Sequence, residues 1–155
     1  MVRTPKYHID DIADWVGKEI GVSDWLEIDQ ERINAFAEAT LDPNPLHVDP
    51  EAARAGPFGV TIAHGFLTLS LLSHFSYEAN LQPAGVDYGI NYGFDRVRFM
   101  SPVKVGDRIR CRMTLSKAQN KGDGRWIVKS TCTVEIEDNP TPALVASWLG
   151  MFIKV

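Results

Sequence analysis

The spacing of apolar and polar residues along this chain has two different periods, and it changes near residue 80. Up to that point apolar positions mostly recur every three or four residues, which predicts helices, and one further apolar run predicts a strand. The expected helices are residues 8–16, 28–40, 50–56 and 61–79, and the expected strand is residues 17–29.

From residue 89 onward, apolar and polar residues alternate along runs rich in Val, Ile, Thr and aromatic side chains, as in antiparallel strands. The expected strands are residues 89–100, 107–121, 125–138 and 142–155, with turn-forming residues between them. We expect them to form a meander. The last three are long for strands, which predicts a strongly curved sheet.

The segment 61–79 carries apolar side chains on almost every side of the helix it predicts. A helix that is apolar nearly all round is a buried one. A curved antiparallel sheet has a concave face that must be covered, and this helix is suited to cover it. The sequence therefore predicts an α+β fold in one domain, residues 1–155, with the sheet wrapped round a single buried central helix.

Two helix starts are marked by acidic residues. Asp29 is placed to cap the helix that follows it, and Glu31 puts a negative charge in its first turn. Asp49 and Pro50 have the order of a capping residue followed by the first helical residue. We therefore expect the Asp49 side chain to serve the backbone.

Composition narrows the class of protein. The net charge is −4, which argues against a nucleic-acid partner. We find no secretory signal at the N-terminus and no apolar stretch long enough to span a bilayer, so a cytoplasmic protein is expected. Cys111 and Cys132 lie in alternating runs without metal-ligand spacing, and we expect two half-buried free thiols.

The stretch TLDPNPLHVDP, residues 40–50, holds two acids, an asparagine, a histidine and three prolines. Little of it is expected to settle into a helix or central strand, because proline fixes its own φ and restricts the residue before it. A stiff loop can hold the Asp42 carboxylate and the His47 imidazole around one small volume, as general acid–base chemistry requires. Asn44 can orient a ligand. The alternative is an ordinary turn in which these residues have structural roles.

His64 and Gly65 stand at the start of the expected buried helix, where backbone N–H groups are unpaired and the helix dipole is positive. Gly65 lets a ligand approach this backbone closely, as in an oxyanion hole, and Ser70 adds a hydroxyl further along. The alternative is that Gly65 allows close packing and His64 is a satisfied interior residue. No metal is expected, because the histidines lack the usual ligand spacings.

Basic residues are frequent in the first strands after residue 88. Arg108, Arg110 and Arg112 alternate, so they share one face of their strand. Two interpretations stay open: a solvated outer face, or a surface in which one or two cations hold the phosphates of a nucleotide-containing ligand.

Three motifs in order, DPNPLHVDPEAA, GPFGVTIAHGFLTLSLL and NYGFDRVRFMSPVKVGDRIR, resemble the MaoC-like dehydratases, also called R-specific enoyl-CoA hydratases or hydratase 2. The resemblance runs from about residue 18 to residue 155 and is closest to the short single-domain members. It implies a hot-dog fold, in which the long helix lies inside the curved sheet. It also implies reversible hydration of a trans-2-enoyl-CoA to the (R)-3-hydroxyacyl-CoA.

The same resemblance implies roles for single residues. Asp42 and His47 become the acid–base pair that activates water, Asn44 shapes the loop and pocket, and Gly65 donates its N–H to the thioester oxygen. Ser70 resembles a pocket-lining serine of some members. No cofactor is needed, because the CoA thioester is itself the substrate.

Two other activities share this fold. One is a non-catalytic acyl-CoA-binding or assembly domain, against which the intact Asp42–His47 pair argues. The other is an acyl-CoA thioesterase, for which residues 62–75 lack the expected carboxylate. A single unit of this fold leaves a sheet edge exposed, so we expect a homodimer joined edge to edge, or a higher oligomer, and no membrane partner.

Overall fold

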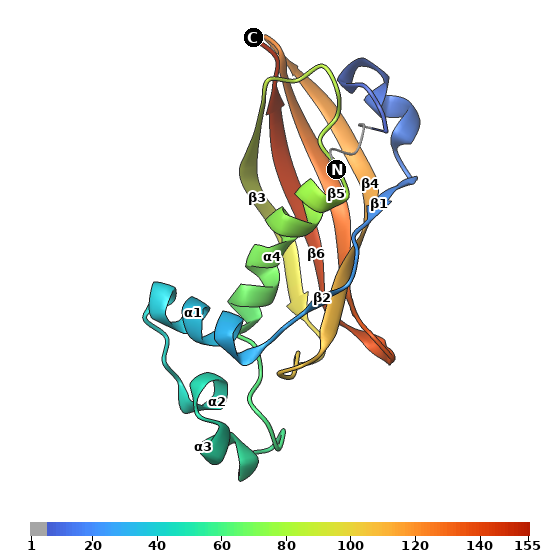
Figure 1. The fold of residues 1–155 in the computed structure, drawn as a ribbon. Coiled ribbons are helices and arrows are strands. Elements are labelled where there is room, and N and C mark those ends of the chain that lie inside the picture. Colours follow the sequence, from blue (N-terminus) through green and yellow to red (C-terminus); the bar gives the residue numbers. More distant parts are fainter. Residues whose placement is uncertain (1–5) are drawn as a thin grey trace.

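The computed structural model describes residues 6–155, and its elements agree with most of the expected ones (Figure 1). The helical elements are one 3₁₀ helix and four α-helices: η1 (Ile9–Trp15), α1 (Gln30–Thr40), α2 (Pro45–Val48), α3 (Pro50–Arg54) and α4 (Gly65–Glu78). The strands are β1 (Glu19–Val22), β2 (Leu26–Glu27), β3 (Tyr88–Phe99), β4 (Arg108–Gly122), β5 (Arg125–Ile136) and β6 (Asn139–Ile153). None of the helices within residues 6–155 has the length and apolar character needed to cross a membrane.

All six strands form one antiparallel sheet in the order β1-β4-β5-β6-β3, with β2 also paired to β4. The expected meander is therefore correct for β4, β5 and β6 and wrong for β3, which pairs with β6 at the far edge. The connection from β3 to β4 therefore runs from one edge of the sheet to the strand beside β1 near the other edge. It is held by the preceding segment: the N–H of Ala63 donates to Val103 O at 2.8 Å, and that of Val105 donates to Thr61 O at 3.0 Å.

The strand expected at residues 17–29 is broken into β1 and β2, both paired with β4. The break falls at Ser23, whose N–H donates to Cys111 O at 3.0 Å. Its side-chain Oγ accepts from the N–H of Cys111 at 2.9 Å. A side-chain oxygen thus takes the place of a backbone carbonyl, which keeps the buried N–H of Cys111 paired where the ladder is interrupted.

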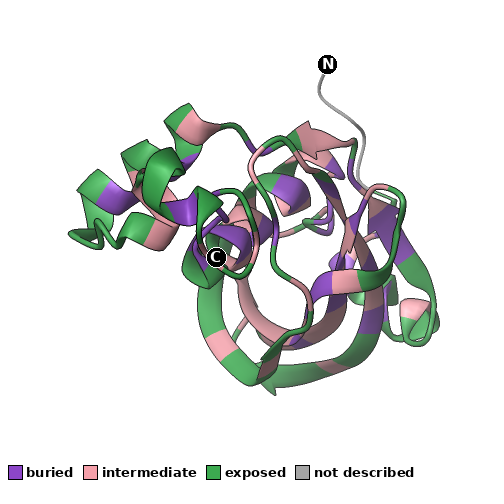
Figure 2. Ribbon diagram, turned by 90° about the horizontal axis from the view of Figure 1, so that it is seen from below, coloured by how far each residue is buried: buried purple, intermediate pink, exposed green. Residues whose placement is uncertain are grey.

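The sheet curves around α4, and the core lies between them (Figure 2). Alternate residues of β4 face α4 and are fully buried, as are Leu72 and Phe75 of the helix. The helix is not buried on all sides, however, because Phe66 and Tyr77 are 70% and 77% exposed. It also begins at Gly65 rather than at residue 61, since residues 61–63 are held extended between α2 and the β3–β4 connection.

The two cysteines are free and buried on the inner face of the sheet. Cys111 and Cys132 lie on neighbouring strands. The hydrogen bond to Cys132, together with burial, raises the pKa of the Cys111 thiol far above its usual value. The expectation of free thiols is confirmed, but both side chains are fully buried in the core and not half-buried.

Candidate active site

The loop after α1 is more ordered than its prolines suggested. Leu41 ends α1 in the left-handed conformation, with φ of 58°, and the N–H of Asp42 donates to Ala37 O at 3.0 Å. Little of residues 40–50 was expected to be helical, and the helix within it that the sequence did not predict is the single turn α2. Asn44 makes this turn possible: its Oδ1 accepts from the N–H of Leu46 at 3.0 Å, and Pro45 occupies the first helical position.

His47 stands in this short helix, and a main-chain carbonyl fixes its ring. Its Nδ1 lies 2.7 Å from the carbonyl oxygen of Ile62. A carbonyl oxygen only accepts hydrogen bonds, so Nδ1 carries the proton and Nε2 is the bare nitrogen. In the neutral form of the ring, the tautomer fixed by Ile62 therefore has Nε2 as the nitrogen that can accept a proton.

His64 lies between Asp42 and His47, contacts both, and is 2% exposed. Its Nε2 donates to the backbone carbonyl of Asp42 at 3.0 Å. Its ring stacks on that of His47, with centroids 3.8 Å apart and planes at 27°. Its Nδ1 has no hydrogen-bond partner within residues 6–155. His64 is thus more than a satisfied interior histidine, because it holds the Asp42 backbone and supports the His47 ring.

The structure brings Asp42 and His47 together, as the sequence predicted. One ligand atom from each of Asp42, His47 and His64 lies within 4.8 Å of the others. The Asp42 side chain is 54% exposed, whereas that of His64 is 3% exposed. A carboxylate and an imidazole that lie this close can hold one water molecule between them. Among residues 6–155 this is the one group of side chains with the spacing of a metal site, and each histidine already binds a carbonyl through one nitrogen.

Gln30 and Thr61 hold the backbone of His47 in place, and sequence reasoning did not identify either residue. Gln30 donates from Nε2 to the carbonyl of His47 at 2.8 Å, and its Oε1 accepts from the hydroxyl of Thr61. Thr61 is 1% exposed. In the sequence Gln30 looks like any residue in a first helical turn, and no local signal marks it. The pairing depends on a contact between positions 31 residues apart.

Gly65 opens α4, and the amides of Leu67 and Thr68 already donate to His64 O at 3.1 and 3.2 Å, so those of Gly65 and Phe66 are the candidate donors to a ligand. A Cβ at Gly65 would lie 3.0 Å from the ring of Phe99, so the absence of a side chain also permits close packing. Ser70 lies on the exposed side of α4, and its hydroxyl donates to Phe66 O at 2.7 Å. Roles for Gly65 and Ser70 toward a ligand stay predictions.

Asp49 has the structural role expected of it. Its side chain accepts from the N–H groups of Glu51 and Ala52, both at 3.0 Å, at the start of α3. Its carboxylate is therefore engaged in capping the helix, not aimed at the dyad.

The arginines of β4 are paired with carboxylates. Arg108 binds Glu137, and Arg110 and Arg112 both bind Glu135. These pairs favour the solvated outer face over a phosphate site. Arg96 and Arg98 on β3 make no ion pair within residues 6–155, so they keep the phosphate hypothesis.

The helix inside a curved antiparallel sheet is the hot-dog fold, and solved hydratases share it. The unliganded R-hydratase PhaJ1 from Pseudomonas aeruginosa superimposes with a TM-score of 0.74 at 24% identity, over 90% of this chain and 83% of that one. A family model for the MaoC-like domain matches residues 11–139. The chain therefore belongs to the MaoC-like dehydratase and hydratase family.

Two relatives match over nearly their whole length. Nodulation protein N from Rhizobium leguminosarum bv. viciae is 49% identical over 140 residues, which are 90% of this chain and 87% of the relative. The 3-hydroxyacyl-thioester dehydratase Z of Mycobacterium tuberculosis is 44% identical over 143 residues, 92% of this chain and 94% of the relative. The dehydratase name supports a hydro-lyase, whereas the nodulation protein's name states no reaction.

Proposed function

We propose that this protein catalyses the reversible, R-specific hydration of a trans-2-enoyl-CoA to the (R)-3-hydroxyacyl-CoA. The observation that carries the proposal is the closeness of the Asp42 carboxylate to the His47 imidazole, each of which has one ligand atom within 4.8 Å of the other's. A domain that only binds acyl-CoA has no need for two such groups around one volume. Family membership and the 44% identical 3-hydroxyacyl-thioester dehydratase support the same reaction class.

The chemistry follows from the positions of the protons. Water held between Asp42 and His47 attacks C3 of the enoyl group through its oxygen, and one of its protons passes to the dyad. The dyad delivers a proton to C2, so one water molecule is added overall and both residues return to their starting states. His64 keeps the His47 ring in place by stacking on it, while Ile62 O keeps the proton on Nδ1.

Negative charge grows on the thioester oxygen as water attacks. The amides of Gly65 and Phe66 at the start of α4 are suited to receive it, because fixed donors stabilise the transition state more than the ground state. The reaction as written uses side-chain and backbone groups of this chain, one water molecule and the CoA thioester. Asn44 contributes by shaping the loop that carries His47.

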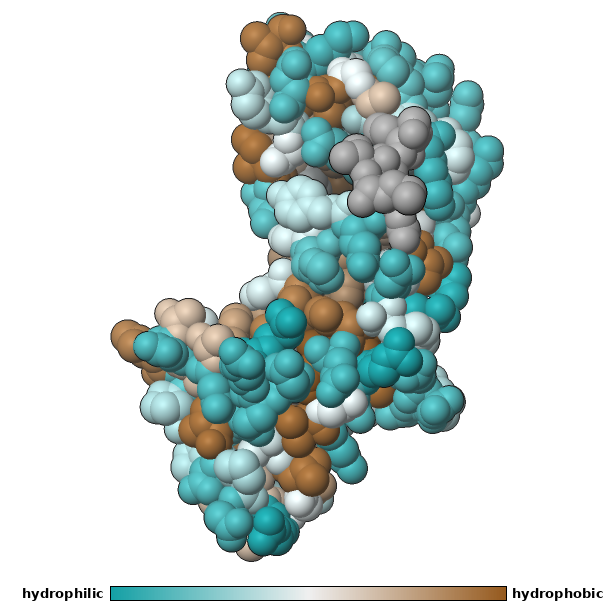
Figure 3. All heavy atoms as spheres, viewed as in Figure 1, coloured by the Kyte–Doolittle hydropathy of each residue, from teal (hydrophilic) through white to brown (hydrophobic). Residues whose placement is uncertain are grey.

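We also infer that the working unit is a homodimer. The strand β3 pairs with β6 alone among the described strands, which leaves its other edge free. Large apolar side chains are exposed along it: Tyr88, Ile90, Tyr92, Phe94 and Phe99. The molecule is hollowed along this side, between the α1–α3 region and the upper end of the sheet (Figure 3). A long exposed edge of this kind is normally covered.

The decisive measurement is the loss of the ultraviolet absorbance of the conjugated thioester in crotonyl-CoA. We expect turnover by the wild type and a fall in kcat of roughly 10²- to 10⁴-fold in Asp42→Asn and in His47→Gln. Circular dichroism must show that both variants remain folded. The product should be refractory to a dehydrogenase specific for (S)-3-hydroxyacyl-CoA. Absence of turnover on crotonyl-CoA and on longer enoyl-CoAs would refute the proposal and leave a binding domain.

A further inference from the structure

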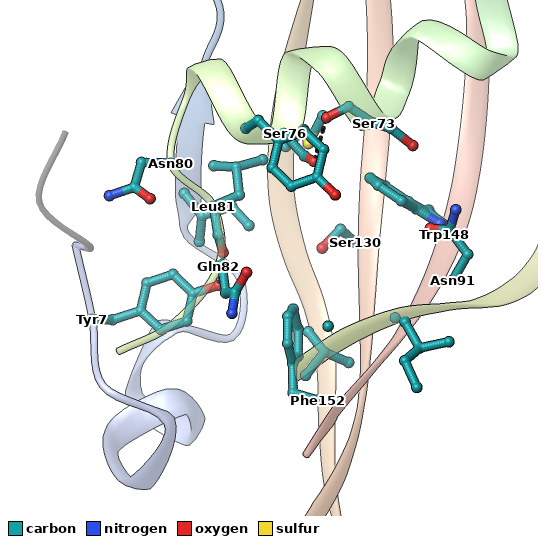
Figure 4. Close-up of a pocket in the computed structure, with 17 residues that line it drawn as sticks. Tyr7, Ser73, Ser76, Asn80, Leu81, Gln82, Asn91, Ser130, Trp148 and Phe152 are labelled. Atoms are coloured by element: carbon teal, nitrogen blue, oxygen red, sulfur yellow. Dashed lines mark hydrogen bonds between the residues drawn. The ribbon is translucent and has the colours of Figure 1, made fainter. Parts of the chain in front are cut away.

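A second feature of the structure is a cavity of about 190 Å³ between the second half of α4 and the concave face of the sheet (Figure 4). It is separate from the dyad, because neither Asp42 nor His47 lines it. Several of its walls are polar or lack a side chain: Ser73, Ser76, Asn91, Ser130, Trp148 and Gly150.

The cavity lies where small and polar residues interrupt the apolar concave face of the sheet. Along β5 the inward positions Cys132 and Val134 are fully buried, but the next inward position is Ser130. Trp148 stands opposite Ser130 on β6, and Gly150 is the next residue on that face. Small and polar residues therefore replace core residues at one place, and packing leaves a space there.

Trp148 carries the observation that points to a ligand. Its indole Nε1 is buried and has no hydrogen-bond partner within residues 6–155. An indole N–H only donates, and a buried donor without an acceptor is costly to leave unpaired. Figure 4 shows Trp148, Ser130 and Asn91 gathered on one side of the cavity. The missing partner is thus a hydrogen-bond acceptor.

The chemical class of the acceptor is limited by charge. Seventeen residues line the cavity, and none of them is Asp, Glu, His, Lys or Arg. A carboxylate or phosphate placed there would lose its hydration without gaining a counter-ion. The group that fits is an uncharged oxygen, such as that of a ketone.

The position of the cavity relates it to the proposed reaction. Gly65 begins α4 beside Phe99 of β3, and Ser73 and Asn91 belong to the same helix and the same strand further along. With a rise of about 1.5 Å per residue, Ser73 and Ser76 lie roughly 12 to 17 Å along the helix from Gly65. An extended chain advances about 1.25 Å per carbon–carbon bond, so roughly eleven to fourteen carbons cover this distance.

We propose that this cavity receives the far end of an acyl chain bearing an oxo group, and that Trp148 Nε1 donates a hydrogen bond to that oxygen. The inference rests on the proposed function, since it takes the thioester to lie at Gly65. It assigns the substrate class as medium-length acyl thioesters oxidised near the end of the chain, and Trp148 as the residue that selects them.

Binding of two saturated thioesters by calorimetry tests the assignment without turnover, because neither has the double bond. The probes are dodecanoyl-CoA and the same chain with a ketone at carbon 10. We expect the wild type to bind the oxo chain roughly two- to tenfold more tightly. Trp148→Phe keeps an aromatic ring but removes the N–H, so it should abolish this preference. Trp126→Phe is the matched control, because Trp126 does not line the cavity, and it should retain the preference.

Three results would overturn the inference: equal or tighter binding of the plain chain by the wild type, a preference that survives in Trp148→Phe, or no binding of either chain. If Trp148→Phe fails to fold, Ser130→Ala replaces it and should weaken the preference. Crotonyl-CoA hydration measured on the same samples reports separately on the proposed function. Hydration without binding of either long chain would refute the proposal for the cavity alone. Selective binding of the oxo chain without hydration would refute the proposed reaction alone.

Discussion

The imidazole of His47 is oriented by three groups of the chain other than Asp42. Ile62 O holds Nδ1, the ring of His64 lies against its face, and Gln30 binds its backbone carbonyl. Each contact restricts a different motion of the ring. A general base that is already oriented loses little entropy when the substrate arrives, which is how positioning contributes to rate.

Asn44 provides a test at the scale of one residue. Its side chain caps the single turn that carries His47, and capping residues contribute about 1 kcal/mol. We expect Asn44→Ala to lower kcat roughly ten- to a hundredfold while KM changes less than about twofold, because the base is displaced.

The matched control for this test is Asn44→Ser, which can still cap and should retain most of the activity. Steady-state kinetics on crotonyl-CoA separate the two roles considered for this residue. A rise in KM at constant kcat would instead make Asn44 a direct ligand of the substrate, as the sequence first suggested.

At the scale of elements, the sequence predicted those whose signals are local. Asp29 and Asp49 cap α1 and α3 as expected, because capping depends on residues two or three positions away. The partner of β3 was predicted wrongly, since alternation marks a strand without saying where it pairs. The contact of Gln30 with Thr61 was missed for the same reason.

A carboxylate on β5 joins three strands on the outer face of the sheet. Glu135 accepts from Arg110 Nε at 2.6 Å and from Arg112 Nε at 3.0 Å, and Arg112 also binds Glu19 of β1. Desolvation raises the pKa of Glu135, but the hydrogen bonds and charges of the two arginines outweigh it, so the pKa is lowered from its usual value. The folded state therefore favours the ionised carboxylate more than the unfolded state does.

The sign of the resulting pH dependence follows from linkage. A lowered pKa in the folded state adds stability that is present above the unfolded pKa and is lost as the pH falls through the folded value. We expect Glu135→Gln to cost about 1 kcal/mol in the free energy of unfolding at pH 7, and almost nothing once Glu135 is protonated. Urea unfolding at pH 7 and near pH 3 measures both. Glu137→Gln, which removes a bond to one arginine only, should cost less at pH 7; a Glu135→Gln loss that does not shrink in acid would contradict this account.

At the scale of the whole molecule, the exposed face of α4 and the free edge of β3 have one explanation in the proposed homodimer, in which a second copy covers both. The sequence predicted a helix buried on all sides, yet Phe66 and Tyr77 are exposed in the single chain. If a second copy covers this side, Phe66 and Tyr77 are buried in the dimer, as the apolar pattern of the helix predicted. A pattern in one sequence does not distinguish burial within the chain from burial between chains.

The homodimer can be tested on β3 itself. Tyr92 is 56% exposed and does not line the cavity. By sedimentation at micromolar concentration we expect a wild-type mass of twice the 17.3 kDa of the chain. Tyr92→Lys should shift it toward the monomer, because a lysine on the pairing edge must lose its hydration when a second edge approaches.

Activity should follow assembly. In the single chain the Asp42 side chain is 54% exposed, and a partner that covers this side of the molecule would exclude water from the dyad and strengthen its electrostatics. We therefore expect kcat to fall in proportion to the dissociated fraction of Tyr92→Lys and to recover at higher protein concentration. Val16→Lys, a charge placed on an exposed apolar residue away from β3, should alter neither mass nor activity. A wild type that is monomeric and fully active would refute the homodimer and show that activity does not depend on covering the free edge of β3.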